Sequence, residues 1–133
     1  DIPDAKISSN RKTMISTIKI YPQFVEAIKG IEEYSHIFVL FWIDKGSHAQ
    51  KLQCHPRGNR SIAKVGVLST RGRNHPNPIG LAVCELVDST THTLTVRKLD
   101  AFHGTKIIDI KPYDDYDLVD NIRLPEWLKS FRT

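Results

Sequence analysis

Runs of apolar residues along the chain predict several short β-strands. Residues 15–21 (ISTIKIY) carry β-branched side chains in near alternation, which is typical of a strand. Residues 36–43 (HIFVLFWI) are almost continuously apolar, as in a central strand with both faces covered. Shorter strand-like runs follow at residues 65–70, 79–87, 93–99 and 106–110. We therefore expect six short strands, two of them joined by a hairpin-length connection at residues 88–92.

Two segments instead show signals for a short helix. Pro22 opens a segment with apolar residues at helical spacing, and Gly30 ends it, so residues 22–29 are predicted to form a helix. Pro125 can open a second short helix within residues 124–131, packing through Trp127, Leu128 and Phe131. Short strands, one or two short helices and long polar loops predict a mainly β protein, a small β-barrel or sandwich rather than a parallel α/β sheet.

Length and composition limit the class of protein. The chain has 133 residues, of which 40% are hydrophobic and 26% charged, which excludes disorder and predicts a single domain over residues 1–133. Its longest apolar run, residues 37–43, is far shorter than the ~20 residues that span a bilayer, so no membrane partner is expected. Cys54 and Cys84 occur in unrelated contexts, which predicts two free thiols and a cytoplasmic location.

Charge is unevenly distributed along the sequence. Between Lys45 and Cys84 there are seven basic residues and no acidic one, although the whole chain carries a net charge of only +4. Lysine and arginine supply most of the affinity for nucleic-acid phosphates, so this segment predicts a phosphate-facing surface. A solvated, loop-rich face is the alternative interpretation of the same pattern.

Residues 69–80 (STRGRNHPNPIG) are the most unusual stretch of the sequence. Two prolines two positions apart, with two arginines spaced in the same way, predict an extended loop, because a residue that precedes proline is disfavoured in a helix. A stiff loop loses less entropy when it holds a ligand, which suits a binding site. A rigid structural turn with solvated arginines is the alternative.

A second polar turn is predicted within residues 99–113 (LDAFHGTKIIDIKPY). Asp100 and His103 lie beside a glycine, so a tight turn there could direct a carboxylate into a cavity, although an ordinary hairpin turn accounts for the pattern equally well. Asp109 and Lys111 are two positions apart on a strand, share one face and can pair with each other.

Several kinds of site have no basis in the sequence. Neither CxxC nor HxxxH spacing occurs, so no metal is expected. The chain has no GxSxG elbow of a serine hydrolase, and it has neither a P-loop nor a GxGxxG fingerprint for a nucleotide.

Taken together, four segments resemble the TsaA/TrmO family. They are GIEEYSHIFVLFWIDK (residues 30–45), the HPRGN unit (residues 55–59), GVLSTRGRNHPNPIG (residues 66–80) and LDAFHGTKIIDIKPY (residues 99–113). The match runs in order from about residue 21 to the C-terminus. The resemblance implies a small β-barrel methyltransferase that uses S-adenosylmethionine (SAM). It also implies a homodimer that methylates N6 of threonylcarbamoyladenosine at position 37, in the anticodon loop of tRNA.

The resemblance also implies which residues form the site. The cofactor is expected to contact Asp44, Lys45, Arg71, Leu81, Asp100, Ala101, Phe102 and His103. A sulfonium cation would be stabilised next to Asp100, and the cofactor's carboxylate needs a cation such as Arg71. Asp100 and His103 are the catalytic candidates, as a base for N6. The groups expected to contact tRNA or shape the pocket are Arg57, Arg73, Asn77 and Lys111.

The chain departs from the family's pattern at several of these positions. His75 stands where the family usually has an arginine, His103 stands in place of an acid, and Asp44 and Lys45 replace a His-Gln pair. The family's opening strand is expected to precede Asp1. Two other functions therefore stay open, a divergent SAM-binding paralogue with another substrate and a non-catalytic RNA-binding barrel.

Overall fold

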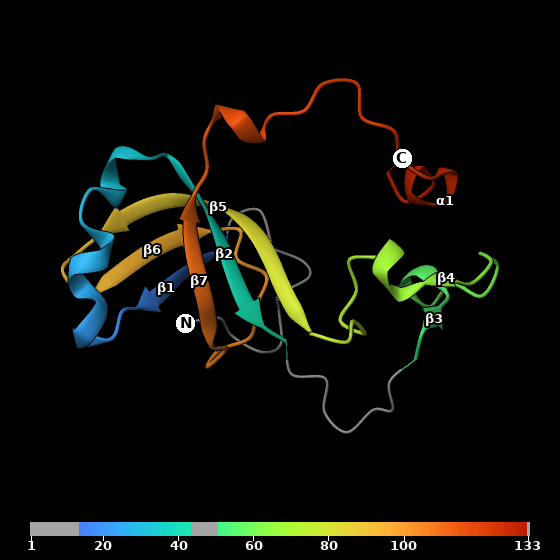
Figure 1. Ribbon diagram of the computed structural model, residues 1–133, viewed down its shortest axis with the longest axis horizontal. Helices are drawn as coiled ribbons and strands as arrows, with labels where there is room; N and C mark the ends of the chain where they lie inside the picture. Colours follow the sequence, from blue (N-terminus) through green and yellow to red (C-terminus); the bar gives the residue numbers. More distant parts are fainter. Residues whose placement is uncertain (1–13, 44–50, 133) are drawn as a thin grey trace. The chain divides into compact units, whose positions relative to one another are not determined.

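A five-stranded antiparallel β-sheet forms the centre of the fold. The computed structural model describes residues 14–43 and 51–132. The sheet has the strand order β1-β6-β5-β2-β7, and every neighbouring pair is antiparallel (Figure 1). Its strands are β1 Ile15–Lys19, β2 His36–Trp42, β5 Ile79–Ser89, β6 Thr93–Arg97 and β7 Ile107–Pro112. The prediction of a mainly β protein is confirmed, as is the hairpin that joins β5 and β6.

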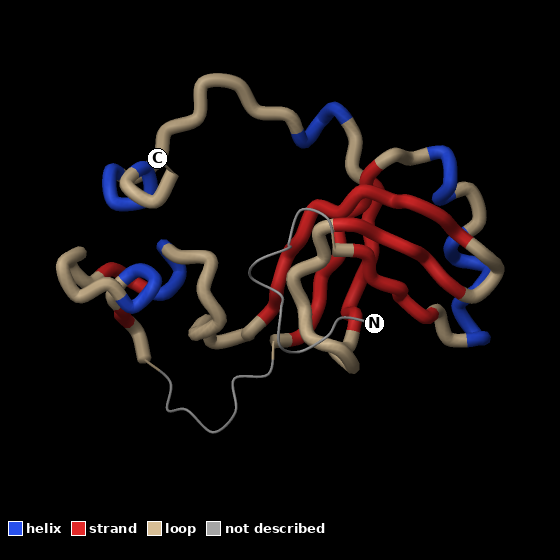
Figure 2. The backbone as a smooth tube through the Cα atoms, turned by 180° about the vertical axis from the view of Figure 1, so that it is seen from behind, coloured by secondary structure: helices blue, strands red, loops and turns tan. Residues whose placement is uncertain are grey.

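The chain divides into two compact units. The sheet unit comprises Asp1–Ile43 and Ile79–Asp117, and the second, here called the loop unit, comprises Asp44–Pro78 and Leu118–Thr133. Figure 2 shows loops and short helical turns making up much of the loop unit. Its regular elements are β3 Gln53–Cys54, which pairs with β4 Val65–Gly66, and the helical turns η3 Pro56–Gly58, η4 Val67–Ser69 and α1 Glu126–Lys129. A single domain over residues 1–133 stays a prediction.

The alternation of side chains along β2 gives the sheet a buried face and an outer face. Successive side chains of a strand point to opposite sides, and Ile37, Val39 and Phe41 are buried. The other buried members of this core are Ile18, Cys84, Leu94, Val96, Leu99 and Ala101. β2 is an interior strand between β5 and β7, as predicted. Its second face is only partly buried, whereas its apolar run predicts that both faces are covered.

Gly80 leaves room for the ring of Phe41 on the neighbouring strand. They are directly opposite each other on β5 and β2. A Cβ atom at position 80 would collide with the ring of Phe41. The contact between these two strands therefore requires a glycine.

Two short 3-10 helices follow β1, where the sequence predicts one helix. They are η1 Pro22–Ile28 and η2 Ile31–Glu33. Gly30, between them, adopts the left-handed conformation with φ 89°, which interrupts the helical path. Ile28 and Ile31 pack against the core of the sheet unit. The predicted end of the helix is confirmed, and two of its apolar residues pack as their spacing indicates, whereas Phe24 is 55% exposed.

The strand predicted at residues 65–70 is wrong beyond Gly66. The Val67 N–H donates to the Leu52 carbonyl at 2.9 Å, and the Val67 carbonyl accepts from the Thr70 N–H at 3.1 Å and from Thr70 Oγ1 at 2.8 Å. These bonds turn the chain as η4. Local hydrogen bonds from a threonine side chain thus replace a continued strand ladder.

Other elements also differ in extent from the prediction, and two of them are β7 and the C-terminal helix. β7 continues through Pro112, which is opposite Ile37, because an edge strand tolerates a residue without an N–H. The α-helix near the C-terminus is a single turn, Glu126–Lys129, shorter than residues 124–131. A further turn, η5 Asp115–Asp117, lies in the acidic segment after β7.

Within residues 14–43 and 51–132 the sheet is open. β1 and β7 form its two edges, so closure into a barrel is not confirmed. Over the same residues, no helix combines the length and the apolar character needed to cross a membrane.

Candidate functional site

The residues predicted to bind a cofactor or RNA divide between the two units. Those in the sheet unit are Leu81, Asp100, Ala101, Phe102, His103 and Lys111. Those in the loop unit are Arg57, Arg71, Arg73 and Asn77. Asp44 and Lys45 lie outside the described residues. The predicted residues are therefore found in both units.

The turn after β6 presents three chemically distinct side chains on a buried support. Leu99 and Ala101 are buried in the core, so Asp100 between them is exposed on the other side of the backbone. Phe102 is 61% exposed, and His103 is exposed beside it. Gly104, with φ 82°, allows the turn that the Thr105 N–H closes by donating to the Phe102 carbonyl at 3.1 Å. This turn thus offers a carboxylate that can stabilise a cation and an aromatic ring that can stack on a base. It also offers an imidazole that can accept a proton.

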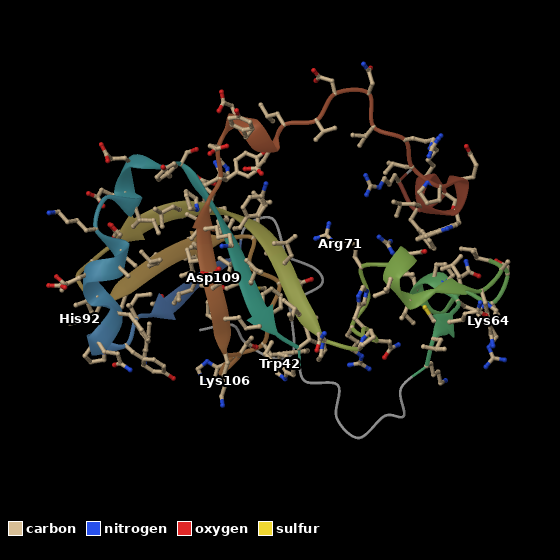
Figure 3. All side chains as sticks on the ribbon, viewed as in Figure 1. Trp42, Lys64, Arg71, His92, Lys106 and Asp109 are labelled. Carbon is tan, nitrogen blue, oxygen red and sulfur yellow. The ribbon has the colours of Figure 1, made fainter. Side chains whose placement is uncertain are left out.

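Leu81 belongs to an apolar patch on the outer face of the sheet. It pairs with Leu40 across β5 and β2. Trp42 pairs with Ile79 in the same register, and each is nearly half exposed. Figure 3 shows Trp42 close to Lys106, whose carbonyl accepts a hydrogen bond from the Trp42 N–H at 3.0 Å. Within the part of the chain that the structure describes, these outer side chains are therefore only partly covered.

Lys111 on β7 is engaged in an ion pair with Asp109. Lys111 Nζ lies 3.0 Å from Asp109 Oδ2, and the two side chains are 62% and 46% exposed. The hydrogen bond from Lys111 lowers the pKa of Asp109 below its ordinary value of 3.8. The predicted pairing of these two residues is confirmed. A phosphate that binds Lys111 has to compete with this carboxylate.

In the loop unit, a turn around η3 holds Arg57 in a defined orientation. Pro56 is buried, and the ring of His55 donates through Nδ1 to the Ile62 carbonyl at 2.8 Å. Arg57 itself has φ 52°, a left-handed conformation that is uncommon for a residue with a side chain. Its guanidinium lies over the ring of Phe131, with Cζ 4.5 Å from the ring centroid.

Residues 70–78 form the irregular segment that the two prolines predict, and hydrogen bonds close part of it. His75 Nε2 donates to the Thr70 carbonyl at 2.8 Å, and Thr70 itself is tied to Val67. Arg71 and Arg73 are exposed along the closed stretch (Figure 3 labels Arg71). The loop therefore carries its two cations on a backbone that is held at both ends.

The two thiols differ in their surroundings. Cys84 is buried in the core, and this burial raises its pKa from 9.0 to about 12. Cys54 is half-buried, and both are free thiols. In the part of the chain that the structure describes, no group of three or more His, Cys, Asp or Glu side chains could hold a metal ion.

Three contacts of the loop unit are not predicted by the sequence. The apolar spacing near the C-terminus indicates packing of Phe131 but gives no signal for its stacking on Arg57. The bonds made by His55 and His75 join residues that share no periodicity. The sequence indicates only that both histidines lie in the basic segment between residues 45 and 84, and this does not predict their hydrogen bonds.

Comparison with known proteins identifies the family. The sequence model described as tRNA-methyltransferase O N-terminal domain matches residues 2–118. The chain belongs to the TrmO family. A probable S-adenosyl-L-methionine-binding protein of Methanothermobacter thermautotrophicus is 41% identical over 119 residues, which cover 90% of this chain and 82% of that protein. The human tRNA (adenine(37)-N6)-methyltransferase is 35% identical over 113 residues, which cover 80% of this chain and 24% of the human protein.

Solved structures of the family share the fold. TrmO from Pseudomonas aeruginosa superposes with a TM-score of 0.64 and 32% sequence identity, over 82% of this chain and 46% of that chain. A second TrmO crystal structure gives a TM-score of 0.69 at 30% identity. The chain therefore spans about half the length of the solved TrmO chains.

Proposed function

We propose that this protein is a SAM-dependent methyltransferase that acts on N6 of adenosine 37 in tRNA, with threonylcarbamoyladenosine as the base it modifies. Membership of the TrmO family carries the proposal, because the family model covers residues 2–118 and relatives over most of this chain are named for binding SAM or for methylating tRNA. The exposed turn of Asp100, Phe102 and His103 supplies chemistry that such a reaction needs.

Each unit contains groups that suit a cationic, zwitterionic cofactor. When bound, SAM supplies a methyl group on a positively charged sulfur. Asp100 is an exposed carboxylate that would stabilise this charge, and Arg71 is an exposed cation for the carboxylate of the cofactor. Buried Ala101 anchors the turn, while Phe102 and Leu81 provide apolar surface. Asp44 and Lys45, the other proposed cofactor contacts, lie outside the described residues.

A proton has to leave the acceptor nitrogen. N6 in a ureido group is a poor nucleophile, so a base at hydrogen-bond distance assists it. Asp100 and His103 are the two proposed bases, since both are exposed on one turn. Phe102 can stack on the adenine ring, as aromatic side chains do with unpaired RNA bases.

The basic segment would bind the anticodon loop of tRNA. Arg57, Arg73 and Asn77 are exposed in the loop unit, and Lys111 is exposed on β7. The protein would work in the cytoplasm as a homodimer. Support for the homodimer comes from the partly exposed apolar side chains on the outer face of the sheet, namely Trp42, Ile79, Leu81 and Val83.

A divergent SAM-binding paralogue with another acceptor is the second candidate function. His75 and His103 favour it, because the resemblance implies an arginine and an acid at these two positions. Both functions share the cofactor site and differ only in the acceptor.

Calorimetric titration of SAM into the intact protein tests the cofactor site first. We expect saturable binding that Arg71→Ala weakens, whereas Arg123→Ala, which removes another exposed arginine of the loop unit, leaves it unchanged. Methyl transfer from labelled SAM is then measured on tRNA with and without the threonylcarbamoyl group. Labelling of the modified tRNA alone supports the primary proposal, and labelling of a different acceptor supports the paralogue. A folded protein that binds no SAM would refute both.

A further inference from the structure

The loop that carries Arg71 is anchored at one end to the interior of the loop unit. Val67 is buried, and its N–H donates to the Leu52 carbonyl at 2.9 Å. Thr70 bonds the carbonyl of Val67 twice, through its N–H at 3.1 Å and through Oγ1 at 2.8 Å. The backbone of Thr70 is therefore fixed immediately before Arg71.

The other end of this stretch is held by a histidine ring. His75 Nε2 lies 2.8 Å from the Thr70 carbonyl oxygen. A carbonyl oxygen only accepts, so Nε2 carries the proton in this bond. His75 is half-buried, whereas residues 71–74 between the two bonded groups are exposed. The His75 bond thus closes a four-residue arc that contains Arg71 and Arg73.

We propose that His75 is a positioning residue for Arg71, holding the arc so that the guanidinium is already placed for the carboxylate of SAM. Without the hydrogen bond from the His75 ring, residues 71–74 adopt more conformations in the free protein. Binding then costs more conformational entropy, and the affinity for SAM falls. The inference rests on the proposed function, because it takes SAM as the ligand of Arg71.

The experiment is a double-mutant cycle on the full chain, in which calorimetry measures the affinity of each variant for SAM. We expect His75→Ala to weaken SAM binding roughly three- to tenfold, the size of one net hydrogen bond. In an Arg71→Ala background the same change should alter the affinity less than about twofold, because no guanidinium is left to position. Equal losses in both backgrounds would mean that His75 acts independently of Arg71, and would overturn the inference.

Conservative variants of His75 distinguish loss of its hydrogen-bond donor from loss of side-chain volume. His75→Gln places an amide N–H at a similar reach and should restore binding to within about twofold, whereas His75→Met keeps the bulk without a donor and should resemble His75→Ala. His92→Ala is the matched control, since His92 is exposed in the β5–β6 turn (Figure 3). Failure of His75→Gln to restore binding, with the variant folded, would also overturn the inference.

Two further readouts distinguish positioning from general stability. The KM for SAM should rise in His75→Ala while kcat at saturating SAM stays within about twofold, because the carboxylate keeps its charge during methyl transfer. Amide hydrogen exchange should accelerate at residues 71–74, and an unchanged exchange rate there would contradict the proposal. Absence of SAM binding by the unmodified protein would instead refute the proposed function itself.

Discussion

The guanidinium of Arg57 lies over the ring of Phe131, with Cζ 4.5 Å from the ring centroid. This contact joins the turn around η3 to the residues that follow α1, so it ties together two distant parts of the sequence. Stacking also leaves the N–H donors in the plane of the guanidinium, where they can still bind a phosphate. Arg57 thus contributes to the packing of the loop unit in a geometry that is compatible with binding an anion.

We predict that Phe131→Leu removes a coupling of about 0.5–1 kcal/mol between these two side chains. The measurement is a double-mutant cycle with Arg57→Ala, read as the free energy of unfolding in urea. Phe131→Tyr keeps an aromatic face and should keep most of the coupling. Effects of Phe131→Leu and Arg57→Ala that simply add would show that the contact contributes nothing to stability.

The sheet could be predicted from the sequence because its signals are local. β2 and the β5–β6 hairpin follow from apolar runs and a short polar connection. The limits of prediction lie at residues 65–70, where the hydroxyl of Thr70 bonds the Val67 carbonyl and turns the chain. Secondary-structure propensities do not predict this bond, since they depend on residue types and not on hydrogen-bonding partners.

The candidate site shows the same division. The pairing of Asp109 with Lys111 follows from two-residue spacing on a strand. The bond from His75 to Thr70 does not, because it depends on the path of an irregular loop for which no periodicity exists. The sequence therefore predicts a pairing along a regular strand, whereas it does not predict the contacts that hold an irregular loop.

Neutralising Asp109 should strengthen binding of tRNA under the proposed function. In Asp109→Asn, the ammonium of Lys111 no longer faces a carboxylate 3.0 Å away and can engage a phosphate instead. We expect a roughly two- to threefold gain in affinity and a salt dependence steeper by up to about one unit. Glu126→Gln, which breaks the exposed ion pair with Lys129, is the control that should leave affinity unchanged. A loss of affinity in Asp109→Asn would exclude Lys111 as a phosphate ligand.

The same ion pair predicts a pH dependence with a definite sign. Because Lys111 lowers the pKa of Asp109, the pair stabilises the folded state above the ordinary carboxyl pKa of 3.8 and loses this contribution as pH falls through the lower folded value. In Lys111→Met the pKa of Asp109 should rise towards 3.8. Titration of the Asp109 carboxyl carbon by NMR measures both values, and identical values in the two proteins would contradict the assignment.

The thiols should differ sharply in reactivity. With its pKa raised to about 12, Cys84 is almost entirely protonated at pH 8, and its side chain is buried. Half-buried Cys54 should therefore account for the rapid reaction of the native protein with a disulfide reagent, at one equivalent per chain. Cys54→Ser should abolish that rapid phase, while denaturation exposes both thiols of the unmodified protein. Two rapid equivalents in the native state would show that the core opens around Cys84.

The requirement for glycine at position 80 gives the sharpest test of packing in the sheet. A Cβ there would collide with the ring of Phe41, so Gly80→Ala should destabilise the protein by roughly 1–3 kcal/mol in urea denaturation. Gly72→Ala is the matched control, because its Cβ would lie at an ordinary 3.6 Å from Thr70 Oγ1. Phe41→Leu removes the ring from the collision, so adding Gly80→Ala to it should cost less than adding Gly80→Ala to the unmodified protein. An equal cost in both backgrounds would show that another neighbour of Gly80, and not Phe41, sets the spacing between β2 and β5.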